Sequence, residues 1–261
     1  RAHGTLDAGD AHHLSTGAFP GSFPAGRIPA LIPLKPEPEV SVFAVLALTA
    51  LTCGSPGAAA AVHPSPPDAQ LAELYGQGLT LEDFVSGARR RKDIWEENVA
   101  AAQLPRDVVE RMAALEGRGS WRLLVVAADW CLDSAHNIPP MDRLALFSDA
   151  LALRVVTPET GGQAVMDARP TSDGRSATPT VVILDEAGNE VGCWIERPAR
   201  QRAFYLANLK GVEEGSDAYD AAVRDFLGWY RSDNGATTLR ELLTLLEAAA
   251  AGATGCVTPG A

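Results

Sequence analysis

An unbroken apolar run constrains the fold of this chain more than any other segment. Residues 123–128 read Leu-Leu-Val-Val-Ala-Ala. A strand that is apolar at every position is covered on both faces, which is typical of an α/β sheet between two layers of helices. Helical patterning follows at once, from about Cys131 to Ala150. The sequence therefore predicts a buried strand that leads into a helix, with Cys131 at the junction.

The segments after this helix predict the rest of the sheet. We expect strands at residues 153–156, 180–184 and 191–195, the last two joined as a hairpin by the turn at 185–189. A right-handed crossover makes the first two strands parallel.

Helices are expected on both sides of these strands. Two precede the first strand, and the second of them begins after Pro105. Three more are expected at about 163–168, 199–209 and 218–230. The last helix carries a core-facing stripe at the spacing of helical turns, formed by Leu239, Leu242, Leu243 and Leu246.

Proline and glycine divide the chain into three regions. We expect residues 1–67 to be a disordered tail ending in a Pro-rich linker, 68–250 to form one α/β domain, and 251–261 to be a flexible tail. Within the first tail, residues 40–53 form an apolar run of about signal-peptide length, too short to span a bilayer comfortably. Two glutamates stand just before it, where a signal carries positive charge. A cytoplasmic location is therefore our first interpretation, with export or lipid anchoring as the alternative.

Charge argues against some partners. The formal net charge is −11, which disfavours nucleic acid and anionic membranes as binding partners. The basic run Arg89-Arg90-Arg91-Lys92 is interpreted as a solvated helix face that pairs with Asp93, Glu96 and Glu97.

The chain has four widely spaced cysteines, Cys53, Cys131, Cys193 and Cys256. Without a Cys-x-x-Cys pair they match no usual zinc pattern, so no metal site is expected. They are too few for a disulfide-rich scaffold, which favours a reducing compartment. We interpret Cys193 as a packing residue, with a resolving thiol as the alternative.

Cys131 is the candidate nucleophile. Free N–H groups and the dipole at a helix start favour thiolate, the reactive form of cysteine. Ligands also bind at strand carboxyl ends in open α/β sheets. The alternative is a buried, inert cysteine.

Several motifs resemble the thioredoxin superfamily. Trp130-Cys131-x-x-Ser134 is similar to Trp-Cys-x-x-Cys with the second cysteine replaced, and Thr178-Pro179-Thr180 resembles the cis-proline loop. Pro139 falls where thioredoxins carry a kinking proline. A closer resemblance, to a bacterial thioredoxin-like group with Trp-Cys-x-Asp-Ser, adds Gly174, Arg175 and Glu196-Arg197-Pro198. The resemblance covers about residues 120–198 and implies a thioredoxin-like fold: a central mixed sheet flanked by helices, with extra N- and C-terminal helices.

The resemblance also implies a substrate groove. Trp130, Thr178 and Pro179 would bind the substrate, with the Thr178–Pro179 peptide bond cis and next to the Cys131 sulfur. The alternative is that Pro179 is an ordinary proline at the start of a strand.

The departures from the motif change the expected chemistry. Ser134 cannot resolve a mixed disulfide, but its hydroxyl can donate a hydrogen bond to a thiolate. Asp133 would disfavour the thiolate, or instead cap the helix, which we prefer. Arg175 either lends positive charge to Cys131 or forms a surface salt bridge. His136 is interpreted as a surface residue.

These features predict a monothiol thiol–disulfide exchange protein that acts through Cys131 and a mixed disulfide. No metal or organic cofactor is implied, although a low-molecular-weight thiol would be a co-substrate. The expected partner is a disulfide-containing protein or a small thiol. The alternative function is a redox-silent binding module that uses the same groove.

Overall fold

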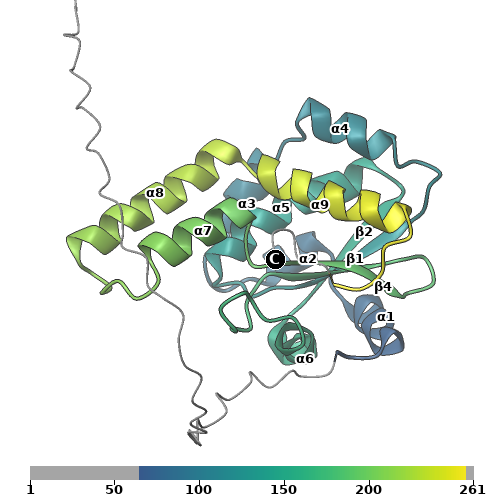
Figure 1. The fold of residues 1–261 in the computed structure, drawn as a ribbon, viewed down its shortest axis with the longest axis horizontal. Helices are drawn as coiled ribbons and strands as arrows, with labels where there is room; N and C mark the ends of the chain where they lie inside the picture. Colours follow the sequence, from purple (N-terminus) through teal and green to yellow (C-terminus); the bar gives the residue numbers. More distant parts are fainter. Residues whose placement is uncertain (1–64, 257–261) are drawn as a thin grey trace, which may run out of the picture. The chain divides into compact units, whose positions relative to one another are not determined.

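The computed structural model describes residues 65–256 (Figure 1). Its centre is a mixed sheet in the order β2-β1-β3-β4. β1 and β2 are parallel, whereas β3 is antiparallel to both β1 and β4. The strands are β1 (Trp121–Val126), β2 (Leu151–Val156), β3 (Thr180–Leu184) and β4 (Glu190–Ile195). The crossover followed by a hairpin is the arrangement predicted from the sequence.

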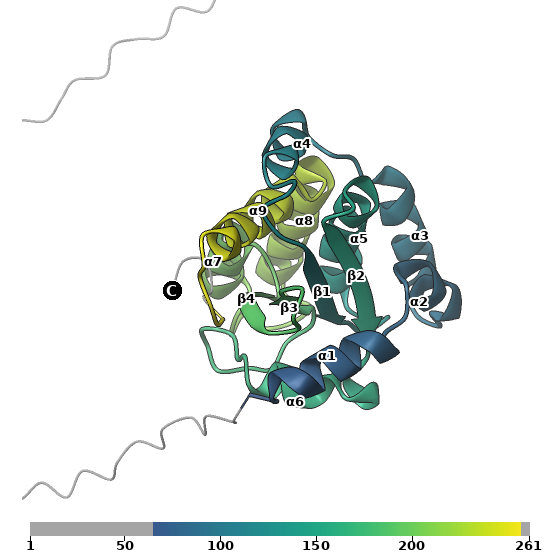
Figure 2. The same ribbon diagram turned by 90° about the vertical axis from the view of Figure 1, so that its right-hand side faces the viewer.

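Helices cover both faces of the sheet (Figures 1 and 2). The larger layer consists of α2 (Leu81–Gly87), α3 (Lys92–Ala101), α4 (Arg106–Ala113), α5 (Leu132–Phe147) and α9 (Ala236–Ala250). The opposite layer consists of α1 (Asp68–Gln77) and α6 (Gly162–Asp167), and a 3-10 turn, η1 (Pro158–Thr160), precedes α6. Two further helices, α7 (Ala199–Asn208) and α8 (Asp217–Asp233), pack against each other.

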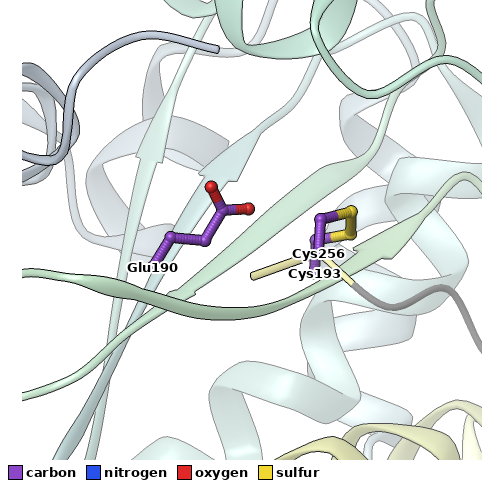
Figure 3. Close-up of side chains that lie close together, drawn as sticks. All are labelled: Glu190, Cys193 and Cys256. Atoms are coloured by element: carbon purple, nitrogen blue, oxygen red, sulfur yellow. A yellow bond between two sulfur atoms is a disulfide. The ribbon is translucent and has the colours of Figure 1, made fainter. Parts of the chain in front are cut away.

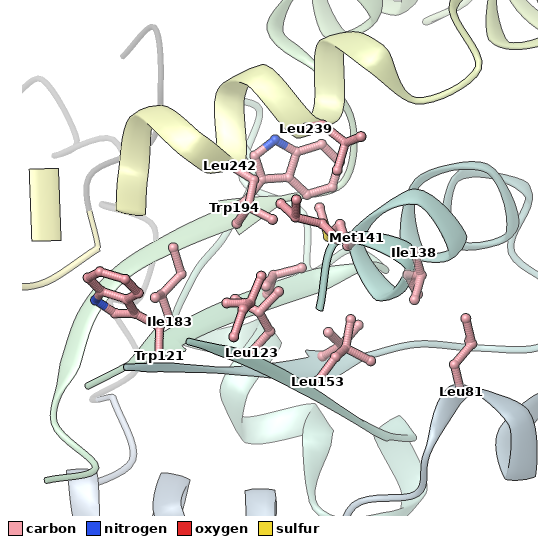
Figure 4. Packing of buried hydrophobic residues seen from close by; sticks show 14 of the residues in the cluster. Leu81, Trp121, Leu123, Ile138, Met141, Leu153, Ile183, Trp194, Leu239 and Leu242 are labelled. Atoms are coloured by element: carbon pink, nitrogen blue, oxygen red, sulfur yellow. The ribbon is translucent and has the colours of Figure 1, made fainter. Parts of the chain in front are cut away.

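The strands alternate their side chains between two cores. Leu123 and Val125 of β1 belong to the larger core, whereas Leu124 and Val126 belong to the core under α1 and α6. Because side chains alternate along a strand, a run that is apolar at every position fills both cores. Figure 4 shows the larger core, where Leu239 and Leu242 of α9 face the sheet. All four leucines of the predicted α9 stripe are fully buried.

Helix α5 begins at the carboxyl end of β1 and carries two prolines in its interior. Cys131 is its N-cap residue. Pro139 has no N–H to donate to the carbonyl of Ala135 one turn earlier. The side-chain amide of Asn98 on α3 donates to that carbonyl instead, at 2.9 Å. A side chain from the neighbouring helix thus replaces the hydrogen bond that Pro139 cannot make.

Some predicted boundaries and contacts differ from the structure. The helix expected to reach Ala150 ends at Phe147. Most of the basic run lies in the loop between α2 and α3, not on a helix face, because only Lys92 belongs to α3. Within residues 65–256 the expected pairing of this run with Asp93, Glu96 and Glu97 does not occur. No helix in this part of the chain combines the length and apolar character needed to cross a membrane.

The end of the described chain is fixed to the outer strand. After α9, the Gly255 N–H donates to the Glu190 carbonyl at 3.2 Å, and Cys256 forms a disulfide with Cys193 of β4 (Figure 3). This corrects the interpretation of Cys193: it is fully buried, but it is bonded to Cys256 and is not a free thiol. The apolar run at 40–53 and residues 257–261 lie outside the described residues, so the expectations for them are not tested.

Candidate active site

Cys131 lies where the sequence predicts it, between β1 and α5. Its side chain is 8% exposed, and it is the free cysteine among residues 65–256. The backbone N–H of Ser134 donates to the Cys131 sulfur at 3.4 Å. The thiol in turn donates to the Thr178 carbonyl at 3.2 Å. The sulfur therefore sits at the helix start with one backbone donor and one backbone acceptor.

The Thr178–Pro179 peptide bond is cis and leads directly into β3. The Pro179 carbonyl accepts the Glu196 N–H at 2.7 Å, which joins this turn to the end of β4. The Thr180 hydroxyl donates to the Ala177 carbonyl at 2.7 Å. These bonds hold the Thr178 carbonyl beside the Cys131 thiol.

Ser134 contacts the sulfur through its backbone and not through its hydroxyl. The side chain is fully buried, and its oxygen has no hydrogen-bond partner among the described residues. The sequence-based expectation of a hydroxyl donor to Cys131 is therefore corrected: the N–H at the helix start takes this role.

Asp133 is not the helix cap that the sequence suggested. The Cys131 sulfur itself caps α5, and the Asp133 carboxylate points to groups from other elements. It accepts the hydroxyl of Tyr230 at 2.5 Å and a guanidinium N–H of Arg197 at 2.7 Å. Burial raises the pKa of Asp133 to about 6, although Arg197 and the Tyr230 hydroxyl act to lower it.

An ion-pair network, largely buried at Asp133, Arg197 and Glu196 and partly exposed at Arg175, extends to the end of β4. Arg197 also bonds to the Glu196 carboxylate at 2.8 Å and stacks on the ring of Tyr205 at 4.3 Å. Arg175 pairs with Glu196 at 3.1 Å and with Asp173 at 2.9 Å. Of the two predicted roles for Arg175, the structure places it in salt bridges, and Arg197 is the arginine that pairs with Asp133.

The neighbours of Asp133 on α5 are tied to α8 and α9. The amide of Asn137 donates to the Tyr230 hydroxyl at 3.2 Å, and its carbonyl oxygen accepts the Thr238 hydroxyl at 2.6 Å. The ring of His136 stacks on Tyr230 with centroids 4.7 Å apart. His136 is half-buried, so it is only partly the surface residue that the sequence suggested, and burial lowers its pKa to about 4.

Trp130 is the exposed aromatic residue beside Cys131, with 52% of its surface accessible. It lines a cleft of about 870 Å³ between the end of α2 and the loop 128–130. Arg89 and Arg90 lie on the rim of this cleft. Sequence reasoning named Trp130 but did not connect it with the two arginines, which lie about 40 residues earlier in the chain.

Three potential metal ligands lie together at β4 and the C-terminal segment. The potential ligand atoms of Glu190, Cys193 and Cys256 lie within 4.8 Å of one another (Figure 3). The two sulfurs are joined in a disulfide, and Glu190 forms an ion pair with the buried Arg169 at 2.6 Å. The cluster therefore has no free thiolate, the form in which cysteine binds metals.

A mixed sheet between helices, with a cysteine at the start of the first crossover helix, defines a protein of the thioredoxin fold class. A sequence model of the thioredoxin family matches residues 78–211, which is more than half of the 261 residues. The chain belongs to this thioredoxin family.

Two solved structures are similar to this fold. A protein of unknown function from Pseudomonas aeruginosa has a TM-score of 0.51 and 24% identity, over 68% of this chain and 97% of that chain. An HIV epitope scaffold has a TM-score of 0.51 and 22% identity, over 67% and 96% of the two chains. At these identities the similarity concerns the fold alone. A search of curated protein sequences found no match.

Proposed function

We propose that this protein carries out thiol–disulfide exchange through Cys131 alone. The observation that carries the proposal is the free Cys131 sulfur at the amino end of α5, where it accepts the Ser134 N–H at 3.4 Å. Unpaired N–H groups and the helix dipole at this position stabilise a thiolate, which is the nucleophile in exchange. Membership of the thioredoxin family supports a redox function of this general kind.

The proposed reaction has two exchange steps. The Cys131 thiolate attacks one sulfur of a substrate disulfide, the substrate S–S bond breaks, and the other sulfur leaves as a thiolate. An external thiolate then attacks the substrate sulfur of the mixed disulfide and releases Cys131 as a thiolate. Ser134 carries no sulfur, and Cys193 is bonded to Cys256, so neither of them resolves the intermediate. The co-substrate is a low-molecular-weight thiol, and the scheme needs no metal or organic cofactor.

The substrate disulfide would approach between Trp130 and the Thr178–Pro179 turn. Trp130 offers an exposed ring next to the nucleophile. The Thr178 carbonyl already accepts the Cys131 thiol proton at 3.2 Å, so this turn lies at the reacting atom. Asp133 and Arg197 are positioning residues in this scheme, because their ion pair at 2.7 Å joins the start of α5 to the segment after β4.

A redox-silent binding module remains the second candidate function. It is favoured by the burial of Cys131, which is only 8% exposed, and by the hydrogen bond from its thiol to the Thr178 carbonyl. In this case the groove beside Trp130 would hold a partner without covalent chemistry.

We further propose that the protein works in an oxidising compartment. The Cys193–Cys256 disulfide supports this, since such bonds persist in exported proteins and are rare in a reducing cytosol. Of the two locations considered from the sequence, this proposal favours export or lipid anchoring, which the apolar run at 40–53 suggested, and not the cytoplasm.

Mass spectrometry after treatment with oxidised glutathione tests the exchange function. We expect a glutathione adduct on Cys131 of the wild type. This adduct should be missing from the mass spectrum of Cys131→Ala. Ser134→Cys should raise the rate of insulin disulfide reduction, because it creates a Cys-x-x-Cys pair on the first turn of α5. Ser148→Cys is the matched control, since this buried serine lies at the other end of α5. Absence of an adduct on Cys131 would favour the binding module.

A further inference from the structure

The cleft beside Trp130 is built from segments that meet at the carboxyl ends of β1 and β2. Its walls are the end of α2, residues 87–90 and the loop 128–130, and Thr157 and Glu159 close the side next to β2. Open α/β sheets bind ligands at this end of the strands. A cleft of about 870 Å³ also lies within the usual size range of small-molecule sites.

Two arginine side chains on this cleft have no partner among residues 65–256. The backbone N–H groups of Arg89 and Arg90 both donate to the Asp129 carboxylate, at 2.9 Å and 3.1 Å. These bonds fix the arginine segment to the residue next to Trp130. Within residues 65–256 neither guanidinium group forms a hydrogen bond or an ion pair, and both residues are exposed. With respect to the described part of the chain, both cationic groups are available to bind an anionic ligand group.

Apart from Thr157, the other lining residues are acidic or apolar. The carboxylate of Asp129 is occupied by the two backbone donors. Asp83 accepts the Thr80 hydroxyl at 2.7 Å, and Glu159 is exposed with a pKa lowered by its own backbone N–H and by Thr157. The rings of Trp130 and Phe84 provide apolar surface between the charges. A cleft with charges of both signs around apolar surface suits a ligand that carries both signs.

We propose that this cleft binds a zwitterionic low-molecular-weight disulfide, meaning a disulfide of an amino-acid-derived thiol that carries carboxylate and ammonium groups. Arg89 and Arg90 bind the carboxylates, since a guanidinium matches a carboxylate with two parallel hydrogen bonds. Asp83 and Glu159 face the ammonium group, and Trp130 packs against the chain between them. This inference rests on the proposed function, because it names the substrate class of the same thiol.

The reaction at Cys131 stays balanced with such a substrate. Cys131 is not among the residues that line the cleft, so the bound disulfide has to extend past Trp130 to reach its sulfur. There the Cys131 thiolate attacks one sulfur of the disulfide, a mixed disulfide forms, and one molecule of the small thiol leaves as its thiolate. The thiolate of a different low-molecular-weight thiol then attacks the substrate-derived sulfur of the mixed disulfide. A new disulfide between the two small thiols forms, and Cys131 returns as a thiolate. The cleft thus serves both the entry and the release of the same chemical group.

The test compares two disulfide probes in the full chain. Oxidised glutathione is zwitterionic, whereas bis(2-hydroxyethyl) disulfide is small and uncharged. In Arg89→Gln/Arg90→Gln we expect the ratio of kcat/KM for oxidised glutathione to that for the uncharged disulfide to fall at least about tenfold, because hydrogen bonds to charged groups are strong. Arg118→Gln/Arg224→Gln removes the same charge at exposed positions outside the cleft lining and should keep the ratio. An unchanged ratio in the cleft variant, or an equal fall in the control, would overturn the inference.

A binding measurement separates this inference from the exchange reaction. S-methylglutathione carries the charged groups of one half of oxidised glutathione but no reactive sulfur, so its affinity in calorimetry does not depend on chemistry at Cys131. We expect binding to the wild type and at least about tenfold weaker binding to the cleft variant. Binding with this dependence but no exchange would reject the proposed function and retain the cleft. Exchange through Cys131 without such binding would retain the function and reject the cleft.

Discussion

The protonation of Asp133, which lies two residues after Cys131, is subject to two opposing effects. Burial favours its neutral form, whereas the Arg197 guanidinium and the Tyr230 hydroxyl favour the carboxylate. The Tyr230 hydroxyl stays protonated, because burial and the Asp133 charge raise its pKa well above 10. Tyr230 therefore remains a donor to Asp133 over the whole range in which the carboxyl group titrates. Only the protonation of Asp133 changes near neutral pH within this pair.

The raised pKa of Asp133 predicts a specific pH dependence of stability. Its pKa is about 6 in the folded protein and 3.8 as the reference for an unperturbed group. The folded state therefore binds more protons between these values, so the stabilising contribution is complete below the lower one and is lost as pH rises through about 6. Relative to Asp133→Asn, we expect the wild-type free energy of unfolding to fall by about 2 kcal/mol from pH 4 to pH 7.

Urea denaturation of both proteins at several pH values measures this difference. His136, with its pKa lowered to about 4, acts in the opposite direction but is present in both proteins and largely cancels. Arg197 and Glu196 are likewise common to both. A difference between the two proteins that stays constant from pH 4 to pH 7 would contradict the raised pKa.

At the scale of elements, one side-chain amide on α3 forms hydrogen bonds to α5. Asn98 donates to the Ala135 carbonyl, which Pro139 leaves without its helical partner, and it also contacts Nδ1 of His136 at 3.2 Å. Removing the amide leaves this carbonyl unsatisfied in a partly buried position. We expect Asn98→Ala to lower the free energy of unfolding by about 1–3 kcal/mol in chemical denaturation.

A matched variant on an exposed helix controls for the loss of an amide. Asn208 donates to the Phe204 carbonyl at 3.0 Å, but this bond is exposed, and water can replace it. Asn208→Ala should therefore change the free energy of unfolding by less than about 0.5 kcal/mol. If both variants lost the same free energy of unfolding, the hydrogen bond from Asn98 to the Ala135 carbonyl would not contribute more than an exposed one.

The elements were predictable from the sequence, whereas their polar contacts were not. The apolar run at 123–128 and the leucine stripe of α9 are local patterns, and the structure confirms both. The bond between Asp133 and Tyr230 joins residues 97 positions apart, and neither residue type indicates its partner. Helix capping was predicted for Asp133 because carboxylates commonly cap helices, but Arg197 offers a buried carboxylate a stronger, charge-assisted bond.

At the scale of the whole described chain, the C-terminal segment is attached to one edge of the sheet. β4 is the outer strand, so its outward N–H and C=O groups have no neighbouring strand. The segment after α9 reaches this edge, where the Gly255 N–H binds the Glu190 carbonyl and Cys256 bonds to Cys193. The connection ties the layer of α9 to the outer strand. A bond between two such segments restricts the unfolded chain much more than it changes the folded one.

The disulfide should therefore contribute a large share of the stability. It joins residues 63 positions apart, and the loop-closure relation gives a loss of up to about 4 kcal/mol in the free energy of unfolding when it is removed. We expect Cys256→Ser to show this loss in urea denaturation without reductant. With dithiothreitol the wild type should approach Cys256→Ser, and Cys131→Ala should respond to reductant as the wild type does, because Cys131 is outside this bond. Wild-type stability that is the same with and without reductant would contradict a stabilising role, since reduction frees the segment after α9 from β4.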